Sequence, residues 1–397
     1  MKIVLINTYA HGGAGIACRR LGEALRSNGH EVVMLTMPEA GSKWPFYAER
    51  LSFLPFEKDK SVRFSFSLAN FGTDISGHPA VKAADIIHLH WINQGFLSLK
   101  NIRRLAASGK PLLWTLHDMW AFTGGCHYSR GCRHFEQSCG RCDYLHCPSA
   151  NDLSHRIWQR KKQILPQNIH FLTCSRWLEG EARCSGLLRD ADVRTLPNPI
   201  DTEVFKPMSE GDRTALRREW GIGPDDKVLL FVAMKVSETR KGFHFLHEAL
   251  LWLSTHSGKS LHVLVLGNAD PESLAAIPFP VHTPGMVKEA VDLARYYSMA
   301  DVFVIPSLED NLPNTVMEAM SCGTPVAGFN TGGIPEMADH GLNGIIVQQG
   351  DSESLAKGIL TILEDKSMGP AARQKVLSHY SFDVIARQYE AMAASFR

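Results

Sequence analysis

The chain has 397 residues, of which 44% are apolar and 21% are charged. This length is too great for one ordinary hydrophobic core and suits two domains of about 150–200 residues each. The 42 Lys and Arg residues nearly balance the 41 Asp and Glu residues, so no overall charge attracts nucleic acid, and we expect no nucleic-acid partner.

The first residues, MKIVLINTYAHGG, have the pattern of a strand that ends in a glycine-rich turn, not of a signal peptide. No apolar run in the chain is long enough to span a membrane. We therefore expect a cytoplasmic protein, in which structural disulfides are rare.

Short apolar runs alternate with longer helix-like segments along the chain. The runs are rich in aliphatic residues and do not alternate between apolar and polar, which is typical of parallel strands buried on both faces. Two successive series of strands and helices predict two doubly wound α/β domains. The runs in the first series are KIVLIN, EVVMLTM, DIIHLHW, PLLWTLHD and IHFLTCS, and those in the second are KVLLFVAM, LHVLVLGN, DVFVIPS, TPVAGFN and GIIVQQ.

The proline-rich stretch LPNPIDTEVFKP, residues 196–207, marks the domain boundary. We predict an N-terminal domain over 1–200 and a C-terminal domain over 201–375. A final helix within 376–397 is expected to pack back toward the N-terminal domain. Residues 119–150 lack periodicity and form an irregular, cysteine-rich insert.

The first motif is NTYAHGGAGIA, between the first strand and the first helix. Gly12 and Gly13 allow close approach of a ligand to the backbone, and the helix start favours a phosphate or a sugar. A tight strand-to-helix turn explains the glycines equally well. The strict dinucleotide fingerprint fails, because Cys18 stands where Gly or Ala is required. Glu39 could still mimic the ribose-binding acid of a dehydrogenase.

The second motif is AMKVSETRKGF, residues 233–243, which carries Lys235 at a strand end and Lys241 beside Arg240. Cations at the carboxyl ends of strands suit a diphosphate. The alternative is a solvated basic loop.

The third motif is PSLEDNLPNTVMEAMSCGTPV, residues 306–326, which follows the strand DVFVIPS. Asp310 precedes a helix, and Glu318 lies about two turns into it. A carboxylate only accepts hydrogen bonds and can bind two hydroxyls, so Asp310 suits a sugar and Glu318 a ribose. Helix capping by Asp310 and an ordinary surface position for Glu318 remain the alternative.

Together these motifs resemble the retaining GT-B glycosyltransferases of the family-four kind (glycosyl transferases group 1). The residues EDNLPN and HDMWAFTGGC are most similar to bacterial exopolysaccharide enzymes of the colanic-acid type. The family usually has Glu where Asp310 stands, so the adjacent Glu309 is an alternative sugar contact. The matching motifs run in order along the chain: GGAG at 12–15, HD at 117–118, LPNPID at 196–201, the Lys235 and Lys241 pair, Asp310 with Glu318, EAMSCGTPV, GGIPE at 332–336 and GLNG at 341–344.

The resemblance implies two doubly wound Rossmann-like domains that face a deep cleft, with the acceptor held by the first and the donor by the second. It implies hexose transfer from a UDP- or GDP-sugar to a saccharide or lipid-linked glycan in exopolysaccharide or cell-surface glycan synthesis. Electrostatic stabilisation of the leaving diphosphate would need no metal or other cofactor. The implied catalytic residues are His117, Lys235, Lys241 and Asp310, and the implied donor contacts are Gly12, Gly13, Asn311, Leu312, Asn314 and Glu318.

Two further readings of the function stay open at this stage. An NAD-dependent dehydrogenase would use the first strand–helix–strand unit, and a sugar-binding protein would show no turnover. The basic stretch HRIWQRKK, residues 155–162, could touch an anionic membrane surface, which would place the protein peripherally at the inner membrane. A solvated helix face explains the same residues.

The stretch GGCHYSRGCRHFEQSCGRC carries Cys126, Cys132, Cys139 and Cys142. The last two have the spacing of a zinc knuckle, so we predict a structural zinc site. Disulfides and free thiols are the alternatives. Substitute ligands for one of the four are Cys147, His127, His134 and His146.

Overall fold

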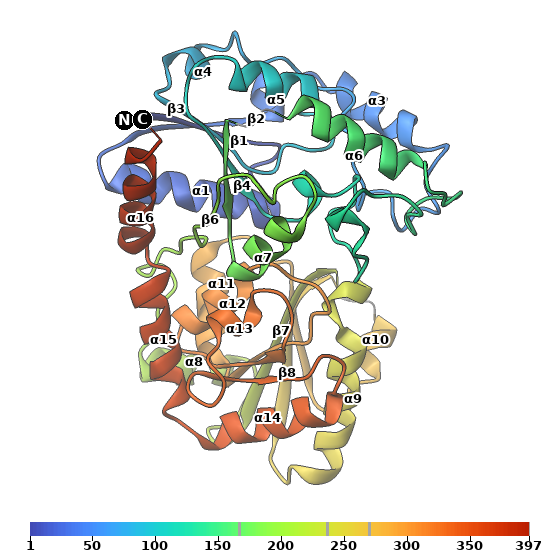
Figure 1. Ribbon diagram of the computed structural model, residues 1–397. Helices are drawn as coiled ribbons and strands as arrows, with labels where there is room; N and C mark the ends of the chain where they lie inside the picture. The colour runs from blue at the N-terminus through green and yellow to red at the C-terminus, as the bar shows by residue number, and fades with distance from the viewer. Residues whose placement is uncertain (166–167, 236–237, 269–270, 397) are drawn as a thin grey trace. The chain divides into compact units, whose positions relative to one another are not determined.

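The protein is described here by a computed structural model that covers residues 1–165, 168–235, 238–268 and 271–396. The chain divides into two compact units. Unit 1 comprises Met1–Pro199 together with Ile385–Arg397, and unit 2 comprises Ile200–Val384. Each unit contains one six-stranded sheet (Figure 1). The predicted α/β class with two doubly wound domains is confirmed.

The sheet of unit 1 has the order β2-β1-β3-β4-β5-β6, and its strands pair in parallel. Five of these strands coincide with the apolar runs, while β6 is a three-residue edge strand that the runs did not predict. The strands are β1 (Lys2–Asn7), β2 (Glu31–Thr36), β3 (Ile86–Leu89), β4 (Leu112–Leu116), β5 (Ile169–Thr173) and β6 (Val193–Thr195).

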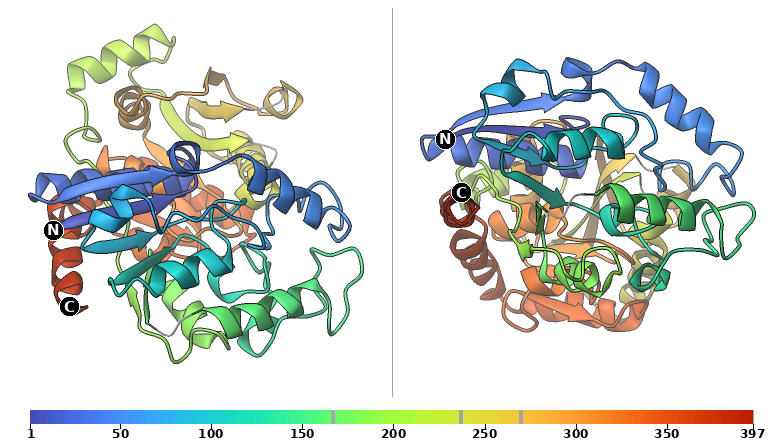
Figure 2. Two further views of the ribbon diagram at one scale, coloured as in Figure 1. Left: turned by 90° about the horizontal axis from the view of Figure 1, so that it is seen from above. Right: turned by 45° about the horizontal axis from the view of Figure 1, so that its top comes forward.

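The helices of unit 1 cover both faces of this sheet: Figures 1 and 2 show α1 and α16 on one face and α5 and α6 on the other. Glu390 of α16 lies 2.8 Å from Nε2 of His30, which ties the end of the chain to its beginning. The helices are α1 (Gly12–Ser27), α2 (Met37–Ala40), α3 (Trp44–Phe53), α4 (Pro79–Ala83), α5 (Leu99–Ala106), η1 (Trp120–Phe122), η2 (His134–Glu136), α6 (Leu153–Ile164), α7 (Arg176–Cys184) and α16 (Phe382–Ala394).

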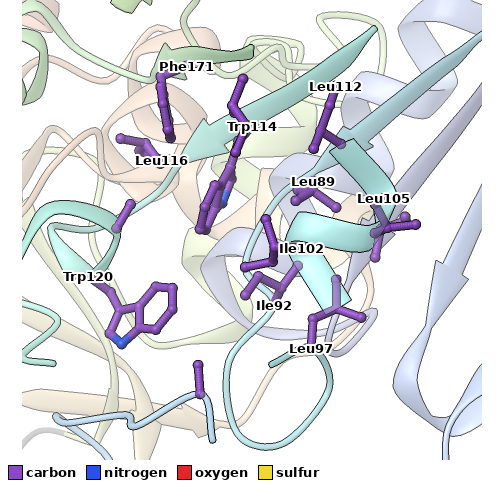
Figure 3. Packing of buried hydrophobic residues seen from close by; sticks show 14 of the residues in the cluster. Leu89, Ile92, Leu97, Ile102, Leu105, Leu112, Trp114, Leu116, Trp120 and Phe171 are labelled. Carbon is purple, nitrogen blue, oxygen red and sulfur yellow. The ribbon is translucent and has the colours of Figure 1, made fainter. Parts of the chain in front are cut away.

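The core of unit 1 lies between the sheet and α5, as Figure 3 shows. Trp114 and Trp120 are the largest side chains labelled there, and both are buried. A buried indole needs a partner for its N–H. Trp114 donates to the carbonyl of His90 and Trp120 to the carbonyl of Ser67. These two bonds fix the segments that follow β3 and β4.

The sheet of unit 2 has the order β12-β11-β10-β7-β8-β9, again in parallel. Here β9 is the strand that the apolar runs did not predict. The strands are β7 (Lys227–Lys235), β8 (Leu261–Asn268), β9 (Val281–Gly285), β10 (Val302–Ile305), β11 (Val326–Phe329) and β12 (Gly344–Val347). The helices are α8 (Glu210–Glu219), η3 (Thr239–Lys241), α9 (Phe243–His256), α10 (Pro271–Ala275), α11 (Ala290–Met299), α12 (Asn314–Ser321), α13 (Ile334–Met337), α14 (Ser352–Glu364) and α15 (Met368–His379).

The order of each sheet contains one point at which successive connections turn to opposite sides. In unit 1 this point lies between β1 and β3, and in unit 2 it lies between β7 and β10. Ligands of open parallel sheets bind outside the carboxyl ends of the strands at such a point. The residues that follow these four strands are therefore the expected ligand-binding region of each unit. None of the helices in the described ranges is long and apolar enough to cross a bilayer.

Candidate active site

In unit 2, the segments after β7 and β10 are bonded to each other. The N–H of Leu308 donates to the carbonyl of Arg240, and the guanidinium of Arg240 donates to the carbonyl of Glu309 at 2.7 Å. Gly242 makes this approach possible. It has φ +69°, and a Cβ there would come within 1.8 Å of the carbonyl oxygen of Pro306, so a larger residue would be both strained and blocked.

This junction brings Lys241 and Asp310 together. The Lys241 ammonium donates to Oδ2 of Asp310 at 2.7 Å, and Nη1 of Arg240 lies 3.6 Å from the same oxygen. Asp310 is only 8% exposed. Burial raises the pKa of its carboxyl, but the charges of Lys241 and Arg240 outweigh burial and leave the pKa below its ordinary value. Asp310 is therefore ionised at neutral pH.

Glu318 lies on α12 and is also buried, at 5% exposure. The hydroxyl of Tyr297, on α11, donates to Oε2 of Glu318 at 2.9 Å. This places a carboxylate on the inner side of the helix rather than on its solvated face. An ordinary surface position for Glu318, the alternative considered from the sequence, is thereby wrong.

The segment between Asp310 and α12 is packed against the loop after β11. Asn311 and Leu312 are buried, while Asn314 is partly exposed and begins the helix. The N–H of Gly333 donates to the carbonyl of Asn311 at 2.7 Å. A Cβ at Gly332 would come within 1.6 Å of the Asp310 carbonyl. The GGIPE motif thus packs against the backbone of the Asp310 segment and stabilises it.

Lys235 is the last residue of β7 and pairs with Asn268 of β8. Its side chain lies outside the described part of the structure. The backbone position at the carboxyl end of a central strand agrees with the sequence prediction.

In unit 1, the segments after β1 and β3 are also joined. The hydroxyl of Thr8 donates to the carbonyls of Trp91 and Asn93, and the N–H of Trp91 donates to the Asn7 side chain. The glycines that follow begin α1. A Cβ at Gly15 would come within 2.5 Å of the Tyr9 carbonyl, so Gly15 is required by the turn itself.

Gly12 and Gly13 differ from Gly15, because a Cβ at either position would meet no atom within 4 Å. Gly12 has φ +75°, which favours glycine on backbone grounds alone. Gly13 has no such constraint. Its lack of a side chain is explained neither by φ nor by packing among the described residues, which fits an open approach to the start of α1.

His117 follows β4 and contacts two buried side chains, those of His90 and Cys174. Its Nε2 lies 3.0 Å from Nδ1 of His90, and its Nδ1 lies 3.5 Å from the thiol of Cys174. Burial lowers the pKa of His117 to about 4 despite the charge of Asp118, and burial lowers that of His90 as well. His117 is therefore a neutral imidazole at neutral pH.

Asp118 has a separate set of hydrogen-bond partners. Its Oδ2 accepts from the indole N–H of Trp91 at 2.8 Å and lies 2.6 Å from Nδ1 of His127. The other ring nitrogen of His127 lies 2.9 Å from the hydroxyl of Ser67. Both nitrogens of His127 are thus occupied, and it is not a substitute metal ligand.

The four predicted cysteine ligands and His134 line one cavity. Cys147 and His146 are exposed and do not line it. All nine cysteines lie in described ranges, and all are free thiols. The predicted cysteine-rich insert is therefore not stapled by disulfides in this structure.

Glu39 and the basic stretch on α6, for which the sequence suggested binding roles, have structural roles instead. Glu39 accepts hydrogen bonds from the N–H and the hydroxyl of Thr36, so it caps α2. In the basic stretch on α6, Trp158 and Lys161 are buried. The only Trp of that stretch therefore lies in the core of unit 1 and is not available for insertion into a membrane.

Sequence reasoning missed Tyr297 and His90 as members of these clusters. Tyr297 lies 21 residues before Glu318 along the chain, so no spacing rule joins them. His90 falls in the predicted strand DIIHLHW, and its polar side chain within an apolar run was the available signal.

The chain matches two family descriptions. "Glycosyltransferase Family 4" matches residues 11–204, and "Glycosyl transferases group 1" matches residues 226–365. An uncharacterised glycosyltransferase of Methanocaldococcus jannaschii is 27% identical over 98% of this chain and 96% of its own.

Two solved structures are similar over nearly the full length. Sucrose-phosphate synthase from Thermosynechococcus elongatus has a TM-score of 0.69 and 21% identity, with 99% of this chain and 98% of that chain covered. HepE from Anabaena, solved in complex with UDP and glucose, has a TM-score of 0.66 and 18% identity, with both chains fully covered. Taken together, the two family matches and the shared fold identify the chain as a GT-B glycosyltransferase of the group 1 family.

Proposed function

We propose that this glycosyltransferase moves a hexose from a UDP- or GDP-sugar, with retention at the anomeric carbon, to a saccharide or lipid-linked saccharide. We assign it to the synthesis of bacterial exopolysaccharide or another cell-surface glycan. The observation that carries the proposal is the buried Asp310 with Lys241 and Arg240 around it, at the point of unit 2 where parallel sheets bind ligands.

This arrangement matches the charge that a sugar transfer develops. The bond to the leaving diphosphate breaks with negative charge on its oxygens, and fixed cations stabilise that charge in a site from which water is excluded. Lys241 has three N–H donors and uses one on Asp310, so it can hold the carboxylate and a phosphate oxygen together. We propose that Lys235, Lys241 and the start of α12 at Asn311–Asn314 take the diphosphate without a metal ion.

The carboxylates then take the two sugars of the donor. Asp310 accepts hydrogen bonds from the hexose, and Glu318 accepts them from the ribose hydroxyls. The hydroxyl of Tyr297 occupies part of the Glu318 carboxylate and fixes its orientation. HepE, which shares the fold, was solved with UDP and with UDP-glucose, and this supports a nucleotide donor for the present chain.

In unit 1, we propose that Gly12 and Gly13 lie beside the donor phosphate and that His117 contacts the transferred sugar. Both ring nitrogens of His117 have partners within unit 1, so the proposed sugar hydroxyl would replace the 3.5 Å contact between Nδ1 and the Cys174 thiol. The contact of its Nε2 with His90 fixes the ring's position. The low pKa of His117 keeps it neutral across the physiological range.

A lipid-linked acceptor requires contact with a membrane surface, and α3 offers one. Trp44, Tyr47 and Leu51 on this helix are 64%, 58% and 66% exposed. Lys58 and Lys60 follow the helix and are exposed, as is Asp59 between them. Exposed aromatic and aliphatic side chains on one helix suit a bilayer interface, so we propose peripheral contact with the cytoplasmic face of the inner membrane through α3.

Thermal melting with UDP, GDP and NAD tests the donor proposal. A nucleoside diphosphate at 100 times its Kd should stabilise the fold by about 2.7 kcal/mol, and NAD should have no effect. Stabilisation by NAD alone would refute the donor proposal.

For the membrane contact, W44S/L51S should abolish sedimentation with phosphatidylglycerol vesicles while leaving UDP stabilisation intact. Equal vesicle binding by this variant would refute the role of α3.

A further inference from the structure

The cysteine-rich insert encloses a cavity of about 40 Å³ that the proposed sugar transfer does not use. Its lining includes Cys126, Cys132, Cys139 and Cys142. Cys139 is buried, Cys126 and Cys142 are partly buried, and Cys132 is exposed. Residues spread over an irregular segment have thus been gathered by the fold around one small space.

The backbone around this cavity donates hydrogen bonds to sulfur. The N–H of Gly124 lies 3.0 Å from Sγ of Cys139, and the N–H of Tyr144 bonds Cys142 two residues before it. Hydrogen bonds to a charged acceptor are stronger than those to a neutral one, and such bonds orient and stabilise metal-bound thiolates. Two of the four sulfurs are therefore already supported as ligands.

Glycines are required where the chain folds around the thiols. A Cβ at Gly124 would come within 2.4 Å of the Ser154 carbonyl and 2.7 Å of the Cys139 Cβ. Gly140, inside the Cys139–Cys142 turn, has φ +155°, and a Cβ there would come within 2.6 Å of the Ala150 carbonyl. Arg141 follows with φ +50°. The turn is therefore a tightly fitted knuckle and not a loose loop.

A buried cation lies beside the same cavity. Lys161 is fully buried, its ammonium donates to the carbonyls of Trp120 and Thr123, and it lies over the Trp120 ring. Burial lowers the pKa of this ammonium to about 7. A buried ammonium is costly unless negative charge compensates it. The ionised Asp118 favours the charged form of Lys161, and thiolates formed at Cys126 and Cys139 on metal binding would favour it further.

We propose that Cys126, Cys132, Cys139 and Cys142 bind one structural Zn²⁺, with Lys161 as the buried counter-charge. Four sulfur ligands and tetrahedral geometry favour zinc. Binding forms four Zn–S bonds and releases four thiol protons to solvent, leaving a centre of net charge −2 that Lys161 partly neutralises. Among the described residues, no three His, Cys, Asp or Glu groups stand at metal-holding positions, so the thiols must rotate into the cavity to close the site.

The proposed zinc would hold a segment that reaches the candidate active site in unit 1. His127, next to Cys126, bonds Asp118, and the N–H of Met119 donates to the His127 carbonyl. The four cysteines thus fix the residues directly after His117. This proposal does not depend on the donor or the acceptor, because it concerns the order of the insert.

Metal analysis of the full chain, purified without chelator, tests the proposal. The wild type should hold about one equivalent of zinc. C139S and C142S should lose it, while C147S, which removes an exposed thiol outside the cavity, should retain it. Apo-protein reloaded with Co²⁺ should show the absorption of a tetrahedral thiolate complex, and C147S should show it equally.

Should C139S and C142S fail to fold, thiol titration of the native wild type tests the zinc site instead. The four cavity thiols should react only after a chelator has removed the zinc, with a fall in Tm. Less than about a tenth of an equivalent of zinc, iron in its place, disulfides between these cysteines, or unchanged zinc in C139S would each overturn the proposal.

Discussion

Replacing Lys241 by Met removes the ammonium that contacts Asp310 but keeps an unbranched side chain. The contact is a 2.7 Å charge-assisted hydrogen bond to a carboxylate that is 8% exposed. Such a bond contributes about 1.5–3 kcal/mol, and a buried charge left wholly unpaired costs about 3–5 kcal/mol. Arg240 remains 3.6 Å from Asp310, so we expect K241M to lower the free energy of unfolding by about 1.5–3 kcal/mol.

Lys357 provides the matched control. Its ammonium lies 2.7 Å from Glu353, the same distance, but both side chains are 59% exposed. An exposed pair contributes about 0–1 kcal/mol, so K357M should change stability little. Calorimetry should show a fall in Tm of about 3–12 °C for K241M and a much smaller one for K357M.

A double-mutant cycle with D310N separates the pair from other effects. In the D310N background no buried carboxylate needs the ammonium, so K241M should cost about 1–3 kcal/mol less than in the wild type. Because the pKa of Asp310 is lowered in the fold, the contribution of the pair is present above the ordinary pKa of 3.8 and is lost as the pH falls below it. Equal costs of K241M in both backgrounds at pH 7 would refute the reasoning.

Three further changes follow from the two candidate clusters. Y297F deletes the donor to the buried Glu318 and should cost about 1–3 kcal/mol of stability and weaken UDP or GDP binding in calorimetric titration; unchanged binding would contradict the role of Glu318. G13A should keep the wild-type Tm but weaken donor binding, whereas G15A should lower the Tm because its Cβ meets the Tyr9 carbonyl; equal Tm values would contradict the packing argument. Burial lowers the pKa of His88 to about 3 and that of His117 to about 4, from 6.5. Below pH 6.5 the unfolded chain therefore binds more protons than the folded one, and the urea midpoint should fall as the pH is lowered from 6.5 to 4. H117Q should reduce this fall, and the same fall in H117Q and the wild type would contradict the argument.

Much of the fold was predictable because buried parallel strands are continuous apolar runs. The strand KIVLIN and the helix that stops at Asn28-Gly29 are examples: α1 ends at Ser27, and Gly29 has φ +82°. The edge strands were not predictable. β6 has three residues, and β9 reads VHTPG with none of its residues fully buried. Strands with little burial carry little apolar signal.

The site was predictable in its residue types and not in its contacts. The position of Asp310 after a strand follows from the sequence. Its contact with Lys241, 69 residues away in the chain, depends on the sheet order that places β7 beside β10. The same limit applies to His117, whose contact with His90 requires β3 to pair with β4. Tertiary pairing supplies these contacts, and local spacing does not encode them.

Release of a nucleoside diphosphate from a panel of UDP- and GDP-sugars tests the central claim most directly. The protein is incubated with each donor, with and without saccharide acceptors, and the products are identified by mass spectrometry. We predict release of UDP or GDP from at least one donor, with a loss of about 10- to 150-fold in kcat/KM for K241M and wild-type turnover for K357M. No release from any donor, or equal turnover by K241M and the wild type, would contradict the account.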